Sequence, residues 1–570
     1  MRSDTRTTSD PWWKAAVVYQ VYPRSFADSD GDGIGDLRGL IDRLPHLADL
    51  GVDVLWLSPV YRSPQDDNGY DISDYQDIDP TFGTLADLDE LIDRLHARGM
   101  RLLMDLVVNH TSDEHPWFEE SRRDRTNPKA DWYVWRDGRP DGVPGEKGTE
   151  PNNWGSFFSG SAWQWCPDRE QYYLHLFSRK QPDLNWENPE VRAAVHDMMR
   201  WWLDRGVDGF RMDVINLISK DAGLPDGELL ANGYGDGMPH YSYGPRVHEF
   251  LAEVKREVFD PRPGRHLTVG EMPGVTPEQA LRFTDRETGE LDMVFQFEHV
   301  ALDQDGPKWN HRPLALVDLK ASLGRWQAAL GDRGWNSLYW NNHDQPRAVS
   351  RFGDDGTHWE ESAKALGTVL HLHRGTPYVY QGEELGMTNV PFDSLEDFED
   401  IESVNHFAEA VALGADPDEV LVSLRRTSRD NARTPMQWDA TPNAGFTTGT
   451  PWLRVNPNHT WLNADAQRED PTSVLAHYRA LVALRHREPV VVDGDFRMLL
   501  PEHPSVYAFE RTLGEECVCV YANLSGESVE DVLTDGWEQW ELLLGNLTAD
   551  PTSSPPPVLA PWEARVYRVR

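Results

Sequence analysis

Short apolar segments recur along the chain, and amphipathic segments separate them. The apolar segments show little alternation of polar and apolar residues, which is typical of parallel strands covered on both faces. In one intervening segment Leu85, Leu88, Leu91 and Leu95 form a helical stripe, and Gly99 supplies a stop signal. Strand and helix alternating eight times predict an α/β fold, the (β/α)8 or TIM barrel. The eight apolar segments begin at Ala16, Val52, Arg101, Gly209, His266, Met293, Asn336 and Thr376.

The spacing of these segments is uneven, which predicts further domains. About a hundred residues separate the third and fourth strands, far more than a compact connection needs. We expect an inserted domain over residues 109–183, a second inserted subdomain over about 383–452, and the barrel in residues 1–108 and 184–489. In residues 490–570 short alternating segments such as SVYAFER and CVCVYANLS predict a C-terminal antiparallel β-sandwich.

The chain is strongly acidic, because 95 Asp and Glu residues stand against 55 Lys and Arg, for a formal net charge of −40. Such a field repels nucleic acid and anionic lipid, so neither is an expected partner. No apolar segment has transmembrane length, and the first residues lack the features of a secretory signal. We expect a cytoplasmic protein without a membrane partner, as a monomer or weak homo-oligomer. Its 3 Cys residues are not expected to form disulfides.

Acidic residues stand where three predicted strands end. Asp213 ends the fourth strand, Glu271 the fifth and Asp344 the seventh. In such a barrel the functional groups lie at the carboxyl ends of the strands, so these carboxyl groups should converge on one site. Cleavage of a glycosidic bond needs a nucleophilic carboxylate and a carboxylic acid, about 5 Å apart when configuration is retained. Read separately, each acid could instead cap the helix after its strand.

Four motifs carry a resemblance to a known family. They are DLVVNH (residues 105–110), GFRMDV (209–214), GE (270–271) and NNHD (341–344). In this order they are similar to the four conserved blocks of the α-amylase family of glycoside hydrolases. The resemblance extends over essentially the whole chain.

The resemblance implies a retaining double displacement on a small oligosaccharide substrate, without an organic cofactor. Asp213 would be the nucleophile, Glu271 the general acid/base and Asp344 the stabiliser of the transition state. Glu271 must be protonated when substrate arrives, so its surroundings should raise its pKa.

Neighbours of these acids are expected to serve the nucleophile and the sugar. Arg211 lies two residues before Asp213 on the same side of the strand and can keep that carboxylate ionised by a charge-assisted hydrogen bond. The resemblance implies that His110 and His343 hydrogen-bond the sugar at the point of cleavage. Read alone, each histidine could equally be a satisfied core residue.

Two further motifs narrow the expected substrate. DDNGYD (66–71) follows the second strand, and the resemblance implies that Tyr70 stacks on the sugar while Asp71 accepts hydrogen bonds from its distal hydroxyls. RDNARTPMQW (429–438) is similar to the segment of α-glucosidases whose first Arg, here Arg429, pairs with that acid. Such a pair would close the site into a pocket for one terminal glucose. The alternative for RDNAR is a solvated loop with local ion pairs.

An acidic loop, DSDGDGIGD, follows the first strand. The carboxylates of Asp28, Asp30, Asp32 and Asp36 and the carbonyl of Ile34 could surround a hard cation. The loop lacks the final Glu of an EF-hand. Similar loops bind Ca²⁺ in many α-glucosidases of the family, so the resemblance implies a structural Ca²⁺.

The residue after the expected nucleophile bears on linkage. Val214 at this place resembles the oligo-1,6-glucosidases and dextran glucosidases, whereas Ala or Thr resembles the α-1,4-specific maltases. A β-branched residue at a strand end could also be ordinary core filling. We expect an exo-acting retaining α-glucosidase that hydrolyses terminal α-1,6-linked glucose from short oligosaccharides, with some α-1,4 activity remaining.

Other members of the family keep alternatives open. An α-1,4-specific maltase or a transglucosylase such as a sucrose isomerase would carry the same four motifs. A non-catalytic transporter subunit would have lost acids of the set, which this chain keeps. A hydrolase of phosphorylated disaccharides needs a cationic pocket, and near the expected nucleophile the chain offers Lys220 in an unfavourable overall field.

Overall fold

The computed structural model describes residues 11–530, 532, 539–547 and 558–569. The first ten residues, part of the segment in which the sequence analysis found no secretory signal, lie outside the described part. Within that part, every helix is too short or too polar to span a lipid bilayer.

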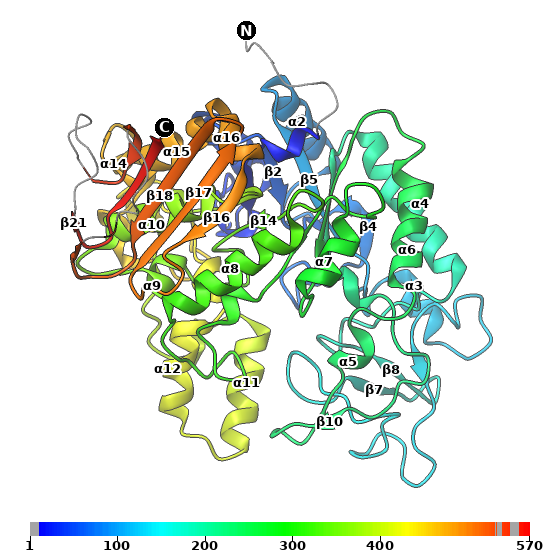
Figure 1. Cartoon of the computed structure of the whole chain (residues 1–570). Helices are drawn as coiled ribbons and strands as arrows, with labels where there is room; N and C mark the ends of the chain where they lie inside the picture. The colour runs from blue at the N-terminus through cyan, green and yellow to red at the C-terminus, as the bar shows by residue number, and fades with distance from the viewer. Residues whose placement is uncertain (1–10, 531, 533–538, 548–557, 570) are drawn as a thin grey trace.

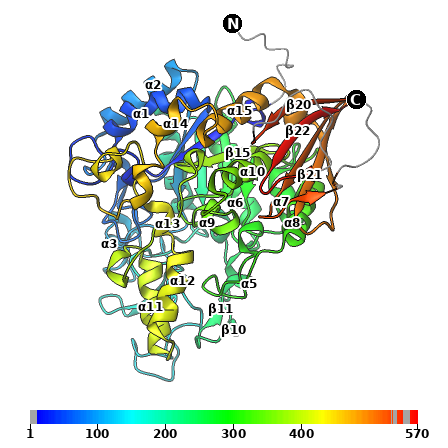
Figure 2. The same ribbon diagram turned by 90° about the vertical axis from the view of Figure 1, so that its left-hand side faces the viewer.

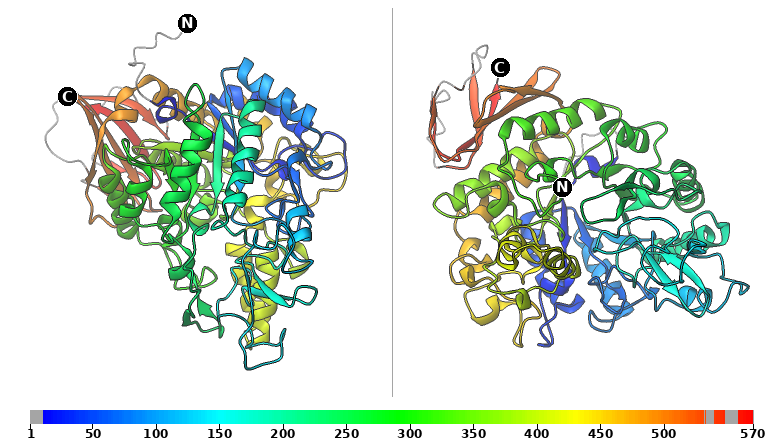
Figure 3. Two further views of the ribbon diagram at one scale, coloured as in Figure 1. Left: turned by 90° about the vertical axis from the view of Figure 1, so that its right-hand side faces the viewer. Right: turned by 90° about the horizontal axis from the view of Figure 1, so that it is seen from below.

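Parallel strands form the centre of the molecule, in the sheet order β13-β12-β9-β5-β2-β1-β15-β14. A parallel bridge between Val294 of β13 and Asn336 beside β14 joins the two edges, so the barrel is nearly closed. Seen from below, helices surround these strands (Figure 3). The predicted (β/α)8 barrel is therefore confirmed. Its strands are β1 (Val18–Val21), β2 (Val54–Leu57), β5 (Arg101–Val107), β9 (Gly209–Asp213), β12 (Leu267–Glu271), β13 (Met293–Phe295), β14 (Ser337–Leu338) and β15 (Thr376–Tyr380).

Five of the eight helices described around the barrel (α1, α2, α4, α7 and α15) start at a side-chain cap, and the helices bury apolar residues against the strands. In α2 the side chains of Thr84 and Asp87 form a capping box, and Leu88, Leu91 and Leu95 are buried as the stripe predicts. The helices that cover the strands are α1 (Leu37–Leu50), α2 (Leu85–Ala97), α4 (Pro189–Arg205), α6 (Val247–Val254), α7 (Pro277–Thr284), α8 (Leu316–Leu330), α10 (Trp359–His371) and α15 (Val474–Arg487).

Two long insertions extend from the same side of the barrel, below it in Figure 1. The insertion after β5 carries a three-stranded antiparallel sheet in the order β6-β8-β7, and the insertion after β15 carries a pair of helices, α11 and α12. Figure 2 shows the β10-β11 hairpin on the same side. These loops leave the carboxyl ends of the strands, where the candidate acids lie. The bounds are α3 (Pro116–Ser121), β6 (Trp135–Arg136), β7 (Trp163–Cys166), β8 (Gln171–Leu174), β10 (Glu228–Leu229), β11 (Gly235–Asp236), α5 (Met238–Tyr241), α11 (Ile401–Ala412), α12 (Pro417–Thr427) and α13 (Asp430–Arg433).

The C-terminal segment forms a five-stranded antiparallel sheet in the order β16-β17-β18-β22-β20, beside a two-stranded ribbon, β19-β21. Val518 and Val520 on one face pack with Leu366 and Val369 of α10 in one apolar cluster. Val490, where the alternating pattern was expected to begin, lies instead in a short helix. The bounds are α16 (Pro489–Asp493), β16 (Asp495–Leu499), β17 (Val506–Leu513), β18 (Glu516–Asn523), β19 (Val529–Glu530), β20 (Trp540–Gly545), β21 (Val558–Leu559) and β22 (Ala564–Val569).

Two buried cations connect this sheet to the barrel. Arg511 of β17 donates to the carbonyls of Leu372, Val491 and Gly494 at 2.6–2.8 Å. Lys320 of α8 donates in the other direction, to carbonyls at the start of the sheet, including that of Leu500 at 2.7 Å. The remaining short elements are β3 (Tyr61–Arg62), β4 (Asp74–Ile78), α9 (Ala348–Phe352) and α14 (Ala464–Arg468).

Candidate active site

The guanidinium of Arg211 connects carboxylates from three adjacent barrel strands. Its Nη1 donates to Asp213 Oδ1 at 2.6 Å and to Asp105 Oδ1 at 2.7 Å, and its Nη2 lies 2.5 Å from Glu271 Oε1. The strands β5, β9 and β12 are neighbours in the sheet, so the parallel register aligns these side chains. Arg211 is fully buried, which strengthens each of these charge-assisted bonds. The structure thus brings Asp213, Glu271 and Arg211 together.

Asp105 belongs to this set, although the sequence analysis did not single it out. Besides Arg211, its carboxylate accepts hydrogen bonds from Trp56 Nε1 at 3.1 Å and from the Tyr70 hydroxyl at 3.0 Å. Burial raises its pKa to about 6, against the opposing effect of Arg211. The available signal was an Asp inside the apolar segment RLLMDLVV, where an unpaired charge would be costly.

Glu271 and Asp213, which both contact Arg211, have raised pKa values. Burial and the nearby Asp213 carboxylate together raise the pKa of Glu271 to about 8, although Arg211 opposes both effects. Burial also raises the pKa of Asp213, to about 7, with the charge of Arg211 acting in the opposite direction. Burial thus raises the pKa of both acids, and the charge of Arg211 opposes this shift in each of them.

Asp344 lies near the end of the loop after β14 and keeps its charge. Burial alone would raise its pKa, but the neighbouring His343 ring and the charges of Arg429 and Arg433 outweigh burial and hold the pKa well below its usual range. Arg433 Nη2 lies 2.8 Å and Arg429 Nη1 3.3 Å from Asp344 Oδ1. Asp344 is more exposed than its partners, with 27% of its side chain accessible, so it can meet a ligand.

The two expected sugar-binding histidines are both buried at this site. His343 Nδ1 pairs with Gln20 Nε2 at 2.8 Å, and its ring lies parallel to that of Tyr70, with 5.1 Å between centroids. His110 Nε2 lies 3.2 Å from the carbonyl oxygen of Tyr70 and 3.2 Å from Gln181 Nε2. Burial lowers the pKa of His343 to about 3 and that of His110 to about 4, so both rings are neutral at pH 7.

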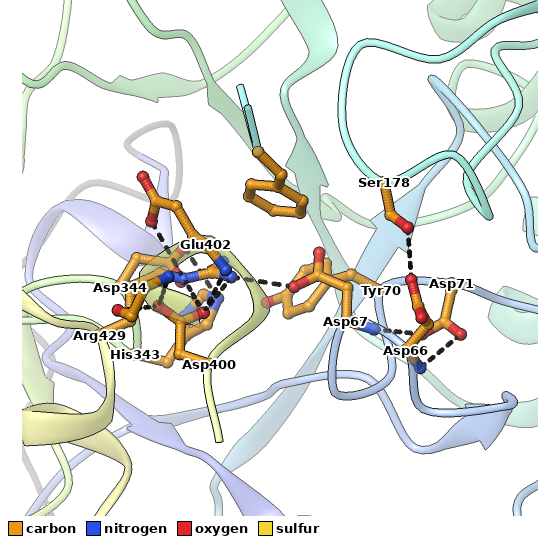
Figure 4. A network of polar contacts seen from close by, with 12 residues as sticks. Asp66, Asp67, Tyr70, Asp71, Ser178, His343, Asp344, Asp400, Glu402 and Arg429 are labelled. Carbon is orange, nitrogen blue, oxygen red and sulfur yellow. Dashed lines mark hydrogen bonds and ion pairs between the residues drawn. The ribbon is translucent and has the colours of Figure 1, made fainter. Parts of the chain in front are cut away.

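The expected pairing of Arg429 with Asp71 is wrong, and Asp67 takes that place. Arg429 Nη2 donates to Asp67 Oδ1 at 3.1 Å (Figure 4). Asp71 is fully buried on the other side of the loop, where it accepts from the backbone N–H groups of Asp66 at 2.8 Å and Asp67 at 3.1 Å and from the Ser63 hydroxyl at 2.9 Å. Asp71 therefore stabilises the turn of this loop through its hydrogen bonds, and in that turn the Asp67 side chain faces Arg429.

Arg429 has further acidic partners that the motif did not indicate. Its Nη2 lies 2.5 Å from Asp400 Oδ1, and its Nε lies 3.4 Å from Glu402 Oε2. Asp400 also caps α11, where its carboxylate accepts from the N–H of Ser403. Burial works against ionisation of Asp400, but Arg429 and Arg433 hold its pKa well below the usual range. The segment is thus a buried ion-pair network rather than a solvated loop.

Val214 adopts an uncommon backbone conformation directly after Asp213. Its φ is +37°, a region that β-branched residues rarely enter, at a cost of about 1–3 kcal/mol. In this conformation its N–H donates to Glu271 Oε2 at 3.2 Å. The side chain packs in an apolar cluster with Trp154 and Leu217, in line with the core-filling alternative.

The acidic loop after β1 gathers part of the expected cation ligands. Asp28, Asp30 and Asp36 each offer an oxygen within 4.8 Å of the others. The exposed Asp32 lies outside this group and accepts from the N–H of Ile34 at 2.8 Å. Asp36 also caps α1 through the N–H of Gly39.

Comparison with known proteins assigns the family. The profile of the alpha amylase catalytic domain matches residues 20–494. The oligo-1,6-glucosidase of Parageobacillus thermoglucosidasius is 56% identical over 98% of this chain and 99% of its own length. The trehalose-6-phosphate hydrolase of Bacillus subtilis is 46% identical over 99% of each.

Solved structures agree with the sequence comparison. The crystal structure of a trehalulose synthase from Pseudomonas mesoacidophila superposes with a TM-score of 0.93 and 45% identity, covering 98% of this chain and 100% of that one. The matched domain includes each of the strands that carry the candidate acids. The chain therefore belongs to the α-amylase family of glycoside hydrolases.

Proposed function

We propose that this glycoside hydrolase is an exo-acting, retaining α-glucosidase that removes terminal α-1,6-linked glucose from short isomalto-oligosaccharides. The observation that carries the proposal is the position of Arg429, which contacts both Asp344 and Asp67. The wall formed by Arg429 and Asp67 stands directly beside the candidate acids. A bound oligosaccharide would have room for one sugar ring between the acids and this wall, and the distal hydroxyls of that ring would contact the side chains of Arg429 and Asp67.

The proposed reaction has two steps with the same pair of acids. Asp213 attacks the anomeric carbon while Glu271 gives its proton to the leaving oxygen. Water then attacks the anomeric carbon, the bond to Asp213 breaks, and Glu271 takes a proton from that water. One guanidinium holds both carboxyl groups, which supports the separation of about 5 Å that retention needs. The ionised Asp344 would bind ring hydroxyls and stabilise the oxocarbenium-like charge.

The linkage preference rests on Val214 and on the relatives. Several of the most similar relatives, at 51–56% identity, are oligo-1,6-glucosidases. Val214 directly follows the nucleophile and donates its N–H to Glu271 Oε2, so we expect its side chain to border the path of the leaving sugar. Discrimination by such an apolar contact is worth about 1–3 kcal/mol, so some α-1,4 activity would remain.

A phosphorylated disaccharide is a less suitable substrate. Lys220, the lysine closest to the nucleophile in sequence, is committed to Asp183 at 2.9 Å and to the Asn109 side chain at 3.2 Å. Asp183 thereby neutralises the charge of Lys220 inside the protein, so this lysine is poorly suited to bind a phosphate group.

The test compares kcat/KM for isomaltose and maltose in the wild type and in Val214→Ala, which keeps the N–H to Glu271. We expect the wild type to prefer isomaltose and the variant to shift the ratio toward maltose by about tenfold. A wild-type preference for maltose, or a ratio that the substitution leaves unmoved, would refute the proposed linkage. Trehalose 6-phosphate and sucrose serve as comparison substrates.

We also propose that the acidic loop holds Ca²⁺ through Asp28, Asp30 and Asp36. Three carboxylate oxygens within 4.8 Å are a donor set that suits a hard cation. Asp28 is pre-oriented, because its oxygens accept from the N–H groups of Gly31 at 2.7 Å and Gly33 at 2.8 Å. The cation would fix the loop between β1 and α1 and take no part in the chemistry.

A further inference from the structure

Two cysteines and a glutamate form a compact buried cluster in the C-terminal sheet, away from the barrel strands that carry the candidate acids. Cys517 and Cys519 lie two residues apart on β18, so both side chains point to the same face. Glu510 of β17 is directly opposite Cys519 in the antiparallel register. One ligand atom from each of the three residues lies within 4.8 Å of the other two.

The cluster is inside the protein. Glu510 is 8% exposed, Cys517 3% and Cys519 fully buried. Tyr521, Tyr567 and Val569 belong to the apolar cluster that contains both cysteines. All three cysteines of the chain are free thiols, so no disulfide consumes this pair.

One oxygen of Glu510 lacks a partner. Its Oε1 accepts from Arg497 Nε at 2.5 Å, whereas its Oε2 is buried and makes no hydrogen bond. A buried carboxylate oxygen without a hydrogen bond destabilises the folded protein, so this oxygen favours binding of a ligand. An outer hydrogen bond to one oxygen of a carboxylate, with the other oxygen left to a metal, is the usual arrangement in metal sites.

The two thiols lie within hydrogen-bonding distance of each other, and the Thr512 hydroxyl donates to Cys517 Sγ at 3.7 Å. A cation that displaced both thiol protons would be bound by both sulfurs as thiolates.

From this geometry we propose that Glu510 Oε2 and the Sγ atoms of Cys517 and Cys519 bind a thiophilic divalent cation of the Zn²⁺ class. Two sulfurs and one carboxylate oxygen suit Zn²⁺ or Cd²⁺ and not Ca²⁺ or Mg²⁺, which take oxygen ligands. Two thiolates and a carboxylate carry three negative charges, and Zn²⁺ together with Arg497 supplies three positive ones. The protein provides three ligands, and a water molecule would complete the tetrahedron.

The site would fasten the β17–β18 hairpin near its turn. Binding exchanges the two thiol protons for the cation, so affinity should fall as the pH is lowered. The cation would bind only the folded sheet, and it should therefore raise the melting temperature in proportion to its occupancy.

The first experiment titrates the calcium-loaded, untagged protein with Cd²⁺ and follows the ultraviolet charge-transfer band of a cadmium thiolate. We expect saturation at one Cd²⁺ per chain, loss of the band in Cys517→Ser and in Cys519→Ser, and no change in Cys166→Ser. Cys166 is the matched control, because it is a buried free cysteine of β7 outside the cluster. A wild-type protein without the band would overturn the proposal.

Two further measurements remain informative if a cysteine variant fails to fold. In the wild type, Zn²⁺ should slow alkylation of Cys517 and Cys519, read by mass spectrometry, and leave the rate at Cys166 unchanged. Arg497→Gln alters a side chain that is 66% exposed and should weaken Cd²⁺ binding about tenfold or more, since it removes the outer bond to Glu510. Equal protection of all three cysteines, or an unchanged Cd²⁺ affinity in Arg497→Gln, would contradict the assignment.

Discussion

Asp67 and Arg429 lie 362 positions apart in the chain and meet at 3.1 Å beside the candidate acids. Breaking a buried pair by neutralising one partner costs about 3–5 kcal/mol, because the other charge is left less well compensated. The variant would also lose the charged acceptor that we propose for the distal hydroxyls of the sugar, so we expect Asp67→Asn to lower kcat/KM for isomaltose at least a hundredfold, which corresponds to about 2.7 kcal/mol. Steady-state kinetics on the folded variant would measure it.

Asp71→Asn is the matched control, four positions along the same loop. Asp71 accepts three hydrogen bonds within the turn and does not contact Arg429, so its loss should lower the melting temperature more than the specificity of the enzyme. A variant pair in which Asp71→Asn abolishes turnover while Asp67→Asn behaves as wild type would restore the original assignment of the sugar-binding acid to Asp71.

Asp213→Asn should abolish turnover while the protein remains folded. The amide oxygen can still accept from Arg211, but an amide does not form the glycosyl-enzyme bond. We expect kcat below about one hundredth of the wild-type value, with an unchanged circular dichroism spectrum. A higher residual rate in protein free of wild-type contamination would remove Asp213 from the nucleophile's role.

Glu271→Gln should distinguish substrates by their leaving groups. Nitrophenyl glucoside needs little protonation of its leaving oxygen, whereas isomaltose needs it fully, so the glycosylation step should slow much more for isomaltose. Identical losses for both substrates would argue that Glu271 is not the acid. Pre-steady-state release of nitrophenol separates this step from hydrolysis of the intermediate.

The pH profile should carry the signature of the same group. Glu271 acts as an acid only when protonated, and its pKa is raised to about 8, so kcat/KM for isomaltose should fall as the pH rises through that value. For nitrophenyl glucoside this alkaline limb should be weaker. A profile that declines with the same midpoint for both substrates would point to another titrating group.

Removal of calcium should lower stability without changing the chemistry. A chelator should reduce the melting temperature of the wild type, because a ligand that binds the folded state stabilises it. Asp30→Asn should have the lower melting temperature already and respond less to the chelator, whereas Asp32→Asn should respond as the wild type does, since Asp32 lies outside the ligand group. Elemental analysis would identify the ion.

The barrel could be predicted because its strands are apolar throughout and alternate with striped helices. Asp213 and Glu271 were found for the same reason, since a strand fixes which of its residues reach the carboxyl edge. Asp344 was expected to end the seventh strand, but it lies in the loop after β14, which ends at Leu338. The loop DDNGYD has no such constraint: Asp67 and Asp71 are both acids, and only the turn decides which one faces Arg429. Asp400 was missed because its partner lies 29 positions further along the chain, beyond the reach of a local motif.

Arg511 gives the C-terminal sheet a role that a separate domain would not have. Its charge is fully buried and satisfied by the carbonyls of Leu372, Val491 and Gly494, which belong to the barrel helices and the junction after them. A gene cut directly after residue 494 would leave the barrel fragment with those acceptors bare and the other fragment with an unsatisfied cation. The two fragments should therefore fail to express as independent proteins. A chimera that takes this sheet from a relative would need to keep both the arginine and the carbonyl groups that accept its hydrogen bonds.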